Sequence, residues 1–388
     1  MKPCHNQAPE KDTNASFKHT LIATAIAVAL TASEAEAANK KAFQINLNPV
    51  SALTRSSNIA YKTTAMASDG SFFVATWIDA QGLIVFRKLD QNGGPLSNEV
   101  TVGNIKGSPQ DSQPQIAMDD AGNFVIVWGN TIGEIYVRLF TASGTPQGEA
   151  ITVTQDGSRP FVAMDAAGNF TVAWNKASSS PPNIETYTKR YDQTGASVGD
   201  LIKIAGEGWL NSLNVDDTGN FILTFSSPSN SGSIVQRFDV NGVAVGGPIS
   251  DAGIDAGVAM DADGDFVVVA TEADYSGGDY SYKLKAKLYD RAGNPRKSIN
   301  VSSSEAVNPI VAMDATGNFI INFTSYSGYK PKLKCYNWKG KPAKAKPNTD
   351  SVKADFNAVA MSDRGRFVGV WQEGNRLLGL SYKLKKFK

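Results

Sequence analysis

Residues 163–174 read Ala163-Met164-Asp165-Ala166-Ala167-Gly168-Asn169-Phe170-Thr171-Val172-Ala173-Trp174, and this stretch is one of seven close copies along the chain. The other copies start at Ala65, Ala117, Asn214, Ala259, Ala312 and Ala360. Their turn glycines are separated by 45 to 53 residues, and a repeat period of this size is typical of a propeller or a solenoid.

Each copy predicts a β-hairpin. Asp165 suits the first corner of a type I turn, and Gly168 suits the left-handed residue that follows, where a side chain would be strained. After the turn, Phe170, Val172 and Trp174 occupy every second position, so they share one face of a strand. We expect this face to be packed in the core.

A second pair of strands is expected between consecutive hairpins. In the second repeat these strands are predicted at residues 134–140 and 149–153, joined by a turn at 141–146. Four strands of about six residues, with connections of about five or six, fill a period near fifty residues, which is the size of a propeller blade. The sequence therefore predicts four antiparallel strands in each repeat.

The two ends of the chain predict how the ring closes. The seventh repeat has its third strand near residues 377–384 and lacks a fourth, whereas residues 43–47 alternate like the fourth strand of other repeats. We expect this N-terminal strand to complete the last blade, so that no sheet edge is left at the seam. The predicted fold is all-β: a single seven-bladed β-propeller domain at residues 38–388.

Residues 1–37 have the features of a secretory signal peptide. Lys2, Lys11 and Lys18 lie in a polar start, residues 20–30 form an apolar run, and Ala35-Glu36-Ala37 offers small residues for cleavage. The run is shorter than the about 20 residues that span a bilayer, and no later segment approaches that length. We expect an exported protein, periplasmic, secreted or at the cell surface, with no transmembrane segment in its mature chain.

Cleavage after Ala37 would leave a mature chain with unusual chemistry. It would remove both histidines, His5 and His19, together with Cys4, and leave Cys335 as the single cysteine. Without histidine, Ser-His-Asp and Cys-His nucleophiles, imidazole bases and histidine-ligated zinc are excluded. A lone cysteine cannot close an internal disulfide. The remaining enzyme chemistries need paired carboxylates, tyrosine or lysine, or a metal held by oxygen ligands.

The repeat also resembles a known kind of protein. Its pattern Ala-Met-Asp-Ala-x-Gly-Asn-Phe-(Val/Ile)-x-x-Trp, followed by Arg-x-(Phe/Tyr)-Asp-x-x-Gly-x-Pro, is similar to the propeller-type repeats of many exported and surface-associated bacterial proteins. The resemblance covers residues 43–388 and implies a propeller fold but no single activity. One departure from the pattern is Ala270, which replaces the aromatic residue in the fifth repeat.

A binding site is expected on the face that carries the variable loops. These loops join the second strand to the third, or one blade to the next, and variable loops on a rigid scaffold commonly carry binding groups. Their aromatic and acidic residues are the candidate ligand-binding groups: Trp209, Asp274, Tyr275, Asp279, Tyr280, Tyr282, Tyr326 and Tyr329. Aromatic rings beside carboxylates suit sugars, which have an apolar face and hydroxyl edges. Alternatively, the tyrosines pack their own loops.

Positive charge is concentrated near the C-terminus. Residues 326–388 hold 15 Lys or Arg and 4 Asp or Glu, whereas residues 38–325 hold 20 and 29. Lysines at every second position predict two ladders on equivalent strand faces, namely Lys283, Lys285 and Lys287, and Lys330, Lys332 and Lys334. Such ladders suit an anionic polysaccharide, a lipid headgroup surface or nucleic acid. Alternatively, the lysines protect an edge strand from aggregation.

One turn is a candidate metal site. The sequence Asp261-Ala262-Asp263-Gly264-Asp265 is similar to oxygen-rich calcium loops, with Asp261, Asp263 and Asp265 as the ligands. The alternative is that Asp serves only the backbone geometry of this turn, as it does in the other repeats. Calcium is the one cofactor that the sequence suggests.

Together these features favour an exported, non-enzymatic binding or interaction module that recognises cell-surface or extracellular glycans through the variable-loop face. Two alternatives stay open: a carboxylate-dependent polysaccharide hydrolase or lyase at the same face, and a structural component of a surface layer or assembly. The candidate partners are a glycan, a surface polyanion or another protein.

Overall fold

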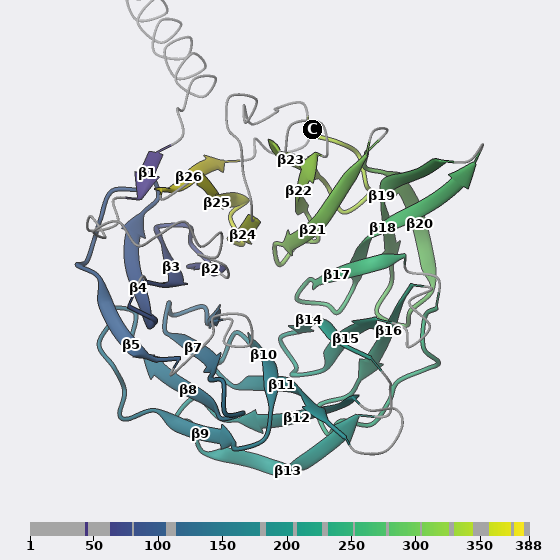
Figure 1. Cartoon of the computed structure of the whole chain (residues 1–388). Helices are drawn as coiled ribbons and strands as arrows, with labels where there is room; N and C mark the ends of the chain where they lie inside the picture. Colours follow the sequence, from purple (N-terminus) through teal and green to yellow (C-terminus); the bar gives the residue numbers. More distant parts are fainter. Residues whose placement is uncertain are drawn as a thin grey trace, which may run out of the picture. The chain divides into compact units, whose positions relative to one another are not determined.

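The computed structural model describes residues 43–45, 63–79, 81–105, 114–178, 184–204, 208–226, 232–250, 253–276, 279–302, 305–325, 330–343, 357–373 and 376–383. These residues form seven antiparallel sheets arranged around a central axis, the architecture of a β-propeller (Figure 1). The expected signal peptide lies outside the described residues. Within the described part of the chain, no helix is long and apolar enough to cross a bilayer.

The first three blades each contain four strands in chain order. Blade 1 consists of β2 (Thr63–Met66), β3 (Phe72–Ile78), β4 (Leu83–Asp90) and β5 (Val100–Asn104). Blade 2 consists of β6 (Gln115–Met118), β7 (Phe124–Gly129), β8 (Ile135–Phe140) and β9 (Ile151–Thr154). Blade 3 consists of β10 (Ser158–Met164), β11 (Phe170–Ala177), β12 (Ile184–Tyr191) and β13 (Ser197–Ile204).

The remaining blades repeat this order from the axis outward. Blade 4 contains β14 (Leu210–Val215), β15 (Phe221–Ser226) and β16 (Ser233–Phe238). Blade 5 contains β17 (Ile254–Met260), β18 (Phe266–Ser276), β19 (Asp279–Tyr289) and β20 (Pro295–Asn300). Blade 6 contains β21 (Ala306–Met313), β22 (Phe319–Ser325) and β23 (Lys330–Tyr336), and blade 7 contains β24 (Asn357–Met361), β25 (Arg366–Glu373), β26 (Arg376–Lys383) and β1 (Phe43–Ile45).

The ring closes as the sequence predicts. Strand β1, from the N-terminal side of the chain, pairs antiparallel with β26, with Phe43 opposite Gly379 and Ile45 opposite Leu377. The innermost strands contact one another in the order β2, β6, β10, β14, β17, β21 and β24, and β24 contacts β2 again. Blade 7 is therefore built from both ends of the described chain, and its outermost strand β1 covers the edge of β26 that would otherwise be open.

Blade 4 departs from the expected four complete strands. Its outer segment makes only single bridges, Val235 with Ile249 and Phe238 with Ala244, in place of a continuous fourth strand. The segment contains Gly246, whose φ is +70°, and Pro248, which has no N–H to donate to a ladder. In blade 6, the described part of the outer segment likewise makes one bridge, between Tyr336 and Pro342.

The repeated turn has the predicted geometry. In blade 3, Asp165 Oδ1 accepts hydrogen bonds from the backbone N–H groups of Ala167 and Asn169, at 3.0 and 2.9 Å. Gly168 has a φ of +90°, in the left-handed region that favours glycine. Asn169 Nδ2 donates to the other carboxylate oxygen of Asp165 at 2.9 Å. The carboxylate and the amide thus close the turn together.

The aromatic face after each turn is buried, as expected. Trp128 of β7 stacks on Tyr136 with ring centroids 5.6 Å apart, and Trp174 of β11 stacks on Tyr187 at 6.1 Å. Both indoles are almost fully buried. Blade 5 has the small residue Ala270 at this position, and the backbone of Gly253 packs closely against it. A Cβ added at Gly253 would lie 3.0 Å from the Ala270 side chain.

Candidate binding site at the channel mouth

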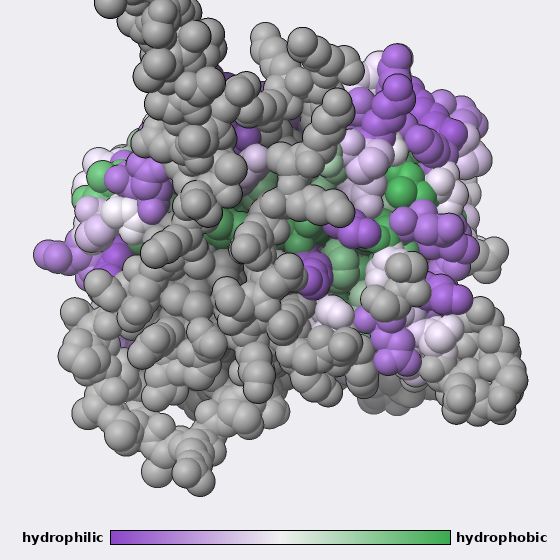
Figure 2. All heavy atoms as spheres, turned by 90° about the horizontal axis from the view of Figure 1, so that it is seen from above, coloured by the Kyte–Doolittle hydropathy of each residue, from purple (hydrophilic) through white to green (hydrophobic). Residues whose placement is uncertain are grey.

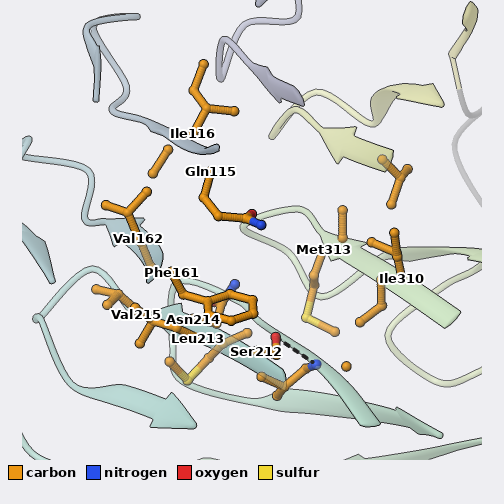
Figure 3. A pocket seen from close by; sticks show the side chains of 18 of the residues that line it. Gln115, Ile116, Phe161, Val162, Ser212, Leu213, Asn214, Val215, Ile310 and Met313 are labelled. Atoms are coloured by element: carbon orange, nitrogen blue, oxygen red, sulfur yellow. Dashed lines mark hydrogen bonds between the residues drawn. The ribbon is translucent and has the colours of Figure 1, made fainter. Parts of the chain in front are cut away.

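A channel follows the axis of the propeller. Its cavity of about 470 Å³ is lined by the innermost strand of every blade. Figure 3 shows Gln115 and Phe161 extending into this space, with Met313 on another side. Most of the lining side chains are apolar, and the polar ones are Thr64, Gln115, Asn211, Ser212 and Asn214. The channel therefore offers both apolar side chains and hydrogen-bonding groups to its interior.

A second cavity of about 370 Å³ opens where the innermost strands of blades 3 to 6 begin. We call it the channel mouth. Its polar lining comes from one residue of each of these four blades, namely Arg159, Asn211, Asp255 and Asn308. It shares residues such as Phe161 and Ile310 with the channel, so the two cavities are adjacent. The mouth lies on the face where loops lead from one blade to the next, which is the face that the sequence favours.

Three residues of the mouth have left-handed backbone conformations. The φ angles of Arg159, Asp255 and Asn308 are +51°, +53° and +54°, and no other non-glycine residue in the described part of the chain has a positive φ. Each is the site of a register shift where its strand joins the next one. Such β-bulges redirect side chains, and strained backbone of this kind is concentrated at functional sites. The conformation thus marks the mouth as a candidate site.

The bulge at Asp255 is held by the preceding blade. The Ala256 carbonyl accepts a hydrogen bond of 2.7 Å from Thr224 Oγ1, and the Ala256 N–H donates to Ser233 Oγ at 3.1 Å. Thr224 and Ser233 are both buried. The strained conformation is therefore imposed by surrounding hydrogen bonds, and Asp255 itself remains exposed to solvent.

Trp209 lies beside the mouth. Its side chain is 42% exposed, and the guanidinium carbon of Arg159 lies 4.5 Å from the centre of its ring. The backbone at Trp209 is fixed on both sides, because Ser226 N–H donates to its carbonyl at 2.8 Å and Leu210 N–H donates to Asn175 Oδ1 at 2.9 Å. Asn175 is fully buried. An exposed indole is thus presented on a rigid support.

The structure places the other candidate ligand residues differently from the sequence-based expectation. Blade 5 has no long loop at 271–283, because β18 and β19 continue as a paired hairpin as far as Ser276 and Asp279. The adjacent glycines at 277–278 are the signal that could have predicted it, since Gly-Gly favours a tight hairpin turn. Tyr282 is half-buried on this hairpin, opposite Ala273.

Several of these candidates remain predictions. Asp274 and Tyr275 belong to β18, and Asp279 and Tyr280 belong to β19, but their side chains lie outside the described part of the structure. Tyr326 and Tyr329 lie wholly outside the described residues. Of the eight residues proposed from the sequence, Trp209 is the one that the structure places beside the mouth.

The polar residues of the mouth itself were not among the candidates predicted from the sequence. Arg159, Asp255 and Asn308 each lie six residues before the aspartate of the repeated turn, where the repeat carries no shared residue. The sequence does show a polar residue at this offset in three repeats. That pattern indicates a shared site only once the ring is known to bring the three positions together.

The opposite end of the channel is acidic. Asp120, Asp217 and Asp363 each follow the first turn residue, in blades 2, 4 and 7 respectively. Burial raises the pKa of Asp217, and the charges of Asp120 and Asp363 raise it further. Burial likewise raises the pKa of Asp363. These carboxylates disfavour anions at this end, so an anionic ligand would approach the channel from the mouth.

The lysine ladder of blade 5 is partly neutralised. Lys285 forms an ion pair with Glu272 of β18, and the Lys287 ammonium lies 3.8 Å from the same carboxylate. Lys283 is exposed and faces Glu272 in the strand register. Figure 2 shows hydrophilic residues gathered at the right, on the side where Figure 1 shows β19 and β20.

In blade 6, Lys332 lies opposite Phe323, and the Lys334 ammonium donates a hydrogen bond to the Val301 carbonyl. Lys330 begins β23, and its side chain lies outside the described part. The register thus supports the predicted alternation, and polyanion binding by the ladders stays a prediction.

Glu272→Gln tests the ladder of blade 5. The substitution removes the carboxylate that Lys285 and Lys287 share, so we expect stronger retention on a heparin column and a salt dependence steeper by about one counterion. Folding stability should change by less than about 1 kcal/mol, because the pairs are partly exposed. Retention equal to that of the wild type at two salt concentrations would argue against polyanion binding by this ladder.

The candidate calcium ligands form a different arrangement. Asp261 Oδ1 accepts the backbone N–H groups of Asp263 and Asp265, at 3.1 and 2.9 Å, as the equivalent aspartates do in other blades. Asp263 is exposed, and Asp265 forms an ion pair with Arg296. In the described part of the chain, no three acidic, histidine or cysteine side chains are arranged to hold a metal ion. Calcium binding therefore stays a prediction.

Blade 5 carries a carboxylate where other blades carry the turn amide. Asp265 replaces Asn, so it cannot donate to Asp261 as Asn169 donates to Asp165. Burial, and then the charge of Asp265, raise the pKa of Asp261 from 3.8 to about 6. The pKa of Asp261 is higher in the folded chain than in the unfolded chain, so protonation of Asp261 favours folding. This contribution to the free energy of unfolding is fully present below pH 3.8 and is lost as the pH rises through about 6.

We expect Asp265→Asn to stabilise the protein at neutral pH. The amide would donate to Asp261 and still accept the Arg291 N–H, which donates to Asp265 Oδ1 at 2.9 Å. With solvent screening and the loss of the partly exposed Arg296–Asp265 ion pair included, the gain at pH 7 should be at most about 1 kcal/mol, and it should disappear at about pH 2.5, where Asp261 is protonated in both states. Urea unfolding at the two pH values measures this difference. A gain that is the same at both would contradict the carboxylate pair as its cause.

No protein-family model matches the chain, and no curated protein matches its sequence. Among solved structures it is similar to the polysaccharide lyase Uly1, with a TM-score of 0.55 and 10% identity over 88% of this chain and 97% of that one. It is also similar to an oligogalacturonate lyase in complex with manganese, with a TM-score of 0.52 and 10% identity over 84% and 91% of the two chains. At this level of identity the likeness shows the fold alone.

Proposed function

We propose that this protein is a binding module that recognises a glycan at the channel mouth. The observation that carries the proposal is the exposed Trp209 ring beside a cavity lined by Arg159, Asn211, Asp255 and Asn308. An indole offers an apolar surface to the face of a sugar ring, and amide and carboxylate groups accept or donate hydrogen bonds at its hydroxyl edge. The mouth combines both kinds of group.

Preorganisation supports this proposal. The left-handed residues of the mouth are held by β-bulges, and the backbone of Trp209 is held by Asn175 and Ser226. Groups that are already ordered lose little conformational entropy when a ligand binds. The proposal agrees with the predicted signal peptide at residues 1–37, since an exported protein would meet extracellular and surface glycans.

A second candidate function is polysaccharide cleavage at the same mouth. It is favoured by Asp255, which is exposed and has a strained backbone, and by the occurrence of a polysaccharide lyase and an oligogalacturonate lyase among proteins of the same fold. A structural role in a surface layer or assembly is the third candidate, and it predicts neither glycan binding nor turnover.

We expect Trp209→Ala to weaken glycan binding by about tenfold or more, which corresponds to about 1.4 kcal/mol of lost apolar contact. The matched control is Trp338→Ala, because Trp338 is also exposed, at 53%, but lies in an outer turn of blade 6. A glycan array, followed by titration of the best ligand, measures both variants.

The same samples separate the candidate functions. Binding that is lost in Trp209→Ala and retained in Trp338→Ala supports the proposal. Equal binding by both variants and the wild type would place the glycan elsewhere. A polysaccharide-turnover assay run beside the array favours the second function if product forms, and the absence of both binding and turnover favours a structural role.

A further inference from the structure

The channel mouth holds two opposite charges that do not neutralise each other. Arg159 and Asp255 line the same cavity from blades 3 and 5. Among the described side chains, no carboxylate forms an ion pair with Arg159, and no cationic group forms one with Asp255. Arg159 is half-buried against Trp209, so its charge is held at the cavity and not on a freely moving side chain. We therefore expect a ligand to supply the anionic group that pairs with the Arg159 guanidinium.

The identity of Arg159 is hard to explain by backbone structure alone. At equivalent positions, blades 5 and 6 have Asp255 and Asn308, two residue types that tolerate the left-handed conformation because their short polar side chains bond locally. Arginine has no such advantage, yet it adopts a φ of +51° here. The strain is explained if the guanidinium serves recognition at this point, because strained residues persist where function requires them.

We infer that the glycan bound at the mouth carries a carboxylate, as in a uronate, and that Arg159 binds this group. The inference rests on the proposed function and names the class of sugar. A guanidinium has a planar fork of N–H donors that matches a carboxylate, and stacking against an indole leaves its edges available for those bonds. Trp209 then contacts the sugar ring next to the carboxylate, since it contacts Arg159 directly.

Asp255 gives this site its selectivity. Its carboxylate accepts hydrogen bonds from sugar hydroxyl groups, with Asn308 and Asn211 as neutral partners around the same cavity. It also repels a second anionic group placed near it, which disfavours densely sulfated chains. The mouth therefore selects a ligand with one carboxylate on the side of blade 3 and hydroxyl groups on the side of blade 5. This distinguishes it from a general polyanion site such as the lysine ladders.

The test compares ligands that differ only in the carboxylate. We would titrate trisaccharides that carry a single uronate residue (galacturonate, glucuronate or mannuronate) among neutral sugars, each beside its carboxyl-reduced counterpart, into the wild type and into Arg159→Asn. Asparagine tolerates the left-handed backbone, so this variant keeps the fold while it loses the cation. Thermal melting of both proteins verifies that the fold is retained.

We expect the wild type to bind at least one uronate about 10- to 100-fold more tightly than its reduced counterpart, which is the strength of a charge-assisted hydrogen-bonded pair. In Arg159→Asn this preference should fall to about threefold or less, with little change for the reduced sugar. Trp338→Ala, a control outside the mouth, should keep both the affinity and the preference for the uronate.

Three results would overturn the inference in different ways. If the wild type binds both members of every pair equally, the glycan site stands and the assignment of the carboxylate to Arg159 is wrong. If the uronate preference survives in Arg159→Asn, another cation recognises the carboxylate. If neither the uronates nor the reduced sugars bind, and the glycan array is also silent, the proposed function fails and this inference with it.

Discussion

Trp174→Ala is expected to lower the free energy of unfolding by about 3–5 kcal/mol, the usual cost of removing a large buried aromatic side chain. The Trp174 indole is 2% exposed and stacks on Tyr187. It also packs against the chain that enters blade 3, because a Cβ added at Gly157 would lie 2.6 Å from its Cδ1 atom. Backbone on one side and a stacked ring on the other cannot collapse fully into the space, so most of the cavity should remain.

The matched comparison is Trp338→Ala. Trp338 is 53% exposed, and its replacement should change stability by less than about 0.5 kcal/mol. Denaturant unfolding of the two variants and the wild type measures the contrast. If both substitutions shift the midpoint equally, Trp174 does not have the core role that the repeat and the packing assign to it.

The second large effect is expected for Gly208→Ala. Gly208 has a φ of +126°, and an added Cβ would overlap the backbone carbonyl oxygen of Ser226. Ser226 belongs to β15 and its N–H donates to the Trp209 carbonyl at 2.8 Å, so neither segment can move without breaking this contact. Left-handed strain and overpacking together should cost about 2–4 kcal/mol. Because Trp209 is displaced, glycan binding should also be lost.

Gly148→Ala separates the clash from the strain. Gly148 has a similar φ of +112°, but an added Cβ would meet no atom within 4 Å. In this variant the free energy of unfolding should fall only by the cost of the left-handed backbone, about 1–2 kcal/mol, and glycan binding should equal that of the wild type. Equal losses of stability in the two variants would show that the contact with Ser226 can relax, and unchanged binding in Gly208→Ala would remove Trp209 from the site.

The sequence by itself determined the architecture of this protein. The turn formed by Asp165 and Gly168, and the strand face formed by Phe170 and Trp174, are local signals that act within about ten residues, and the chain repeats them seven times. Local signals of this kind do not depend on distant contacts, so a periodic copy predicts both the strands and their number. The position of β1 beside β26 also followed from the sequence, because the count of strands left the last blade one strand short.

Only the tertiary structure decided where the candidate site lies. Arg159, Asn211, Asp255 and Asn308 are about fifty residues apart in sequence, and they line one cavity because the ring brings the starts of four inner strands together. The bulge at Asp255 depends on hydrogen bonds from Thr224 and Ser233 in the preceding blade.

The ion pairs of the lysine ladder were likewise decided by the tertiary structure. Glu272 pairs with Lys285 through the register of β18 with β19, which the sequence-based loop at 271–283 did not include. Contacts between strands and between blades have no local pattern in the chain, because each partner is selected by the closure of the fold and not by its sequence neighbours.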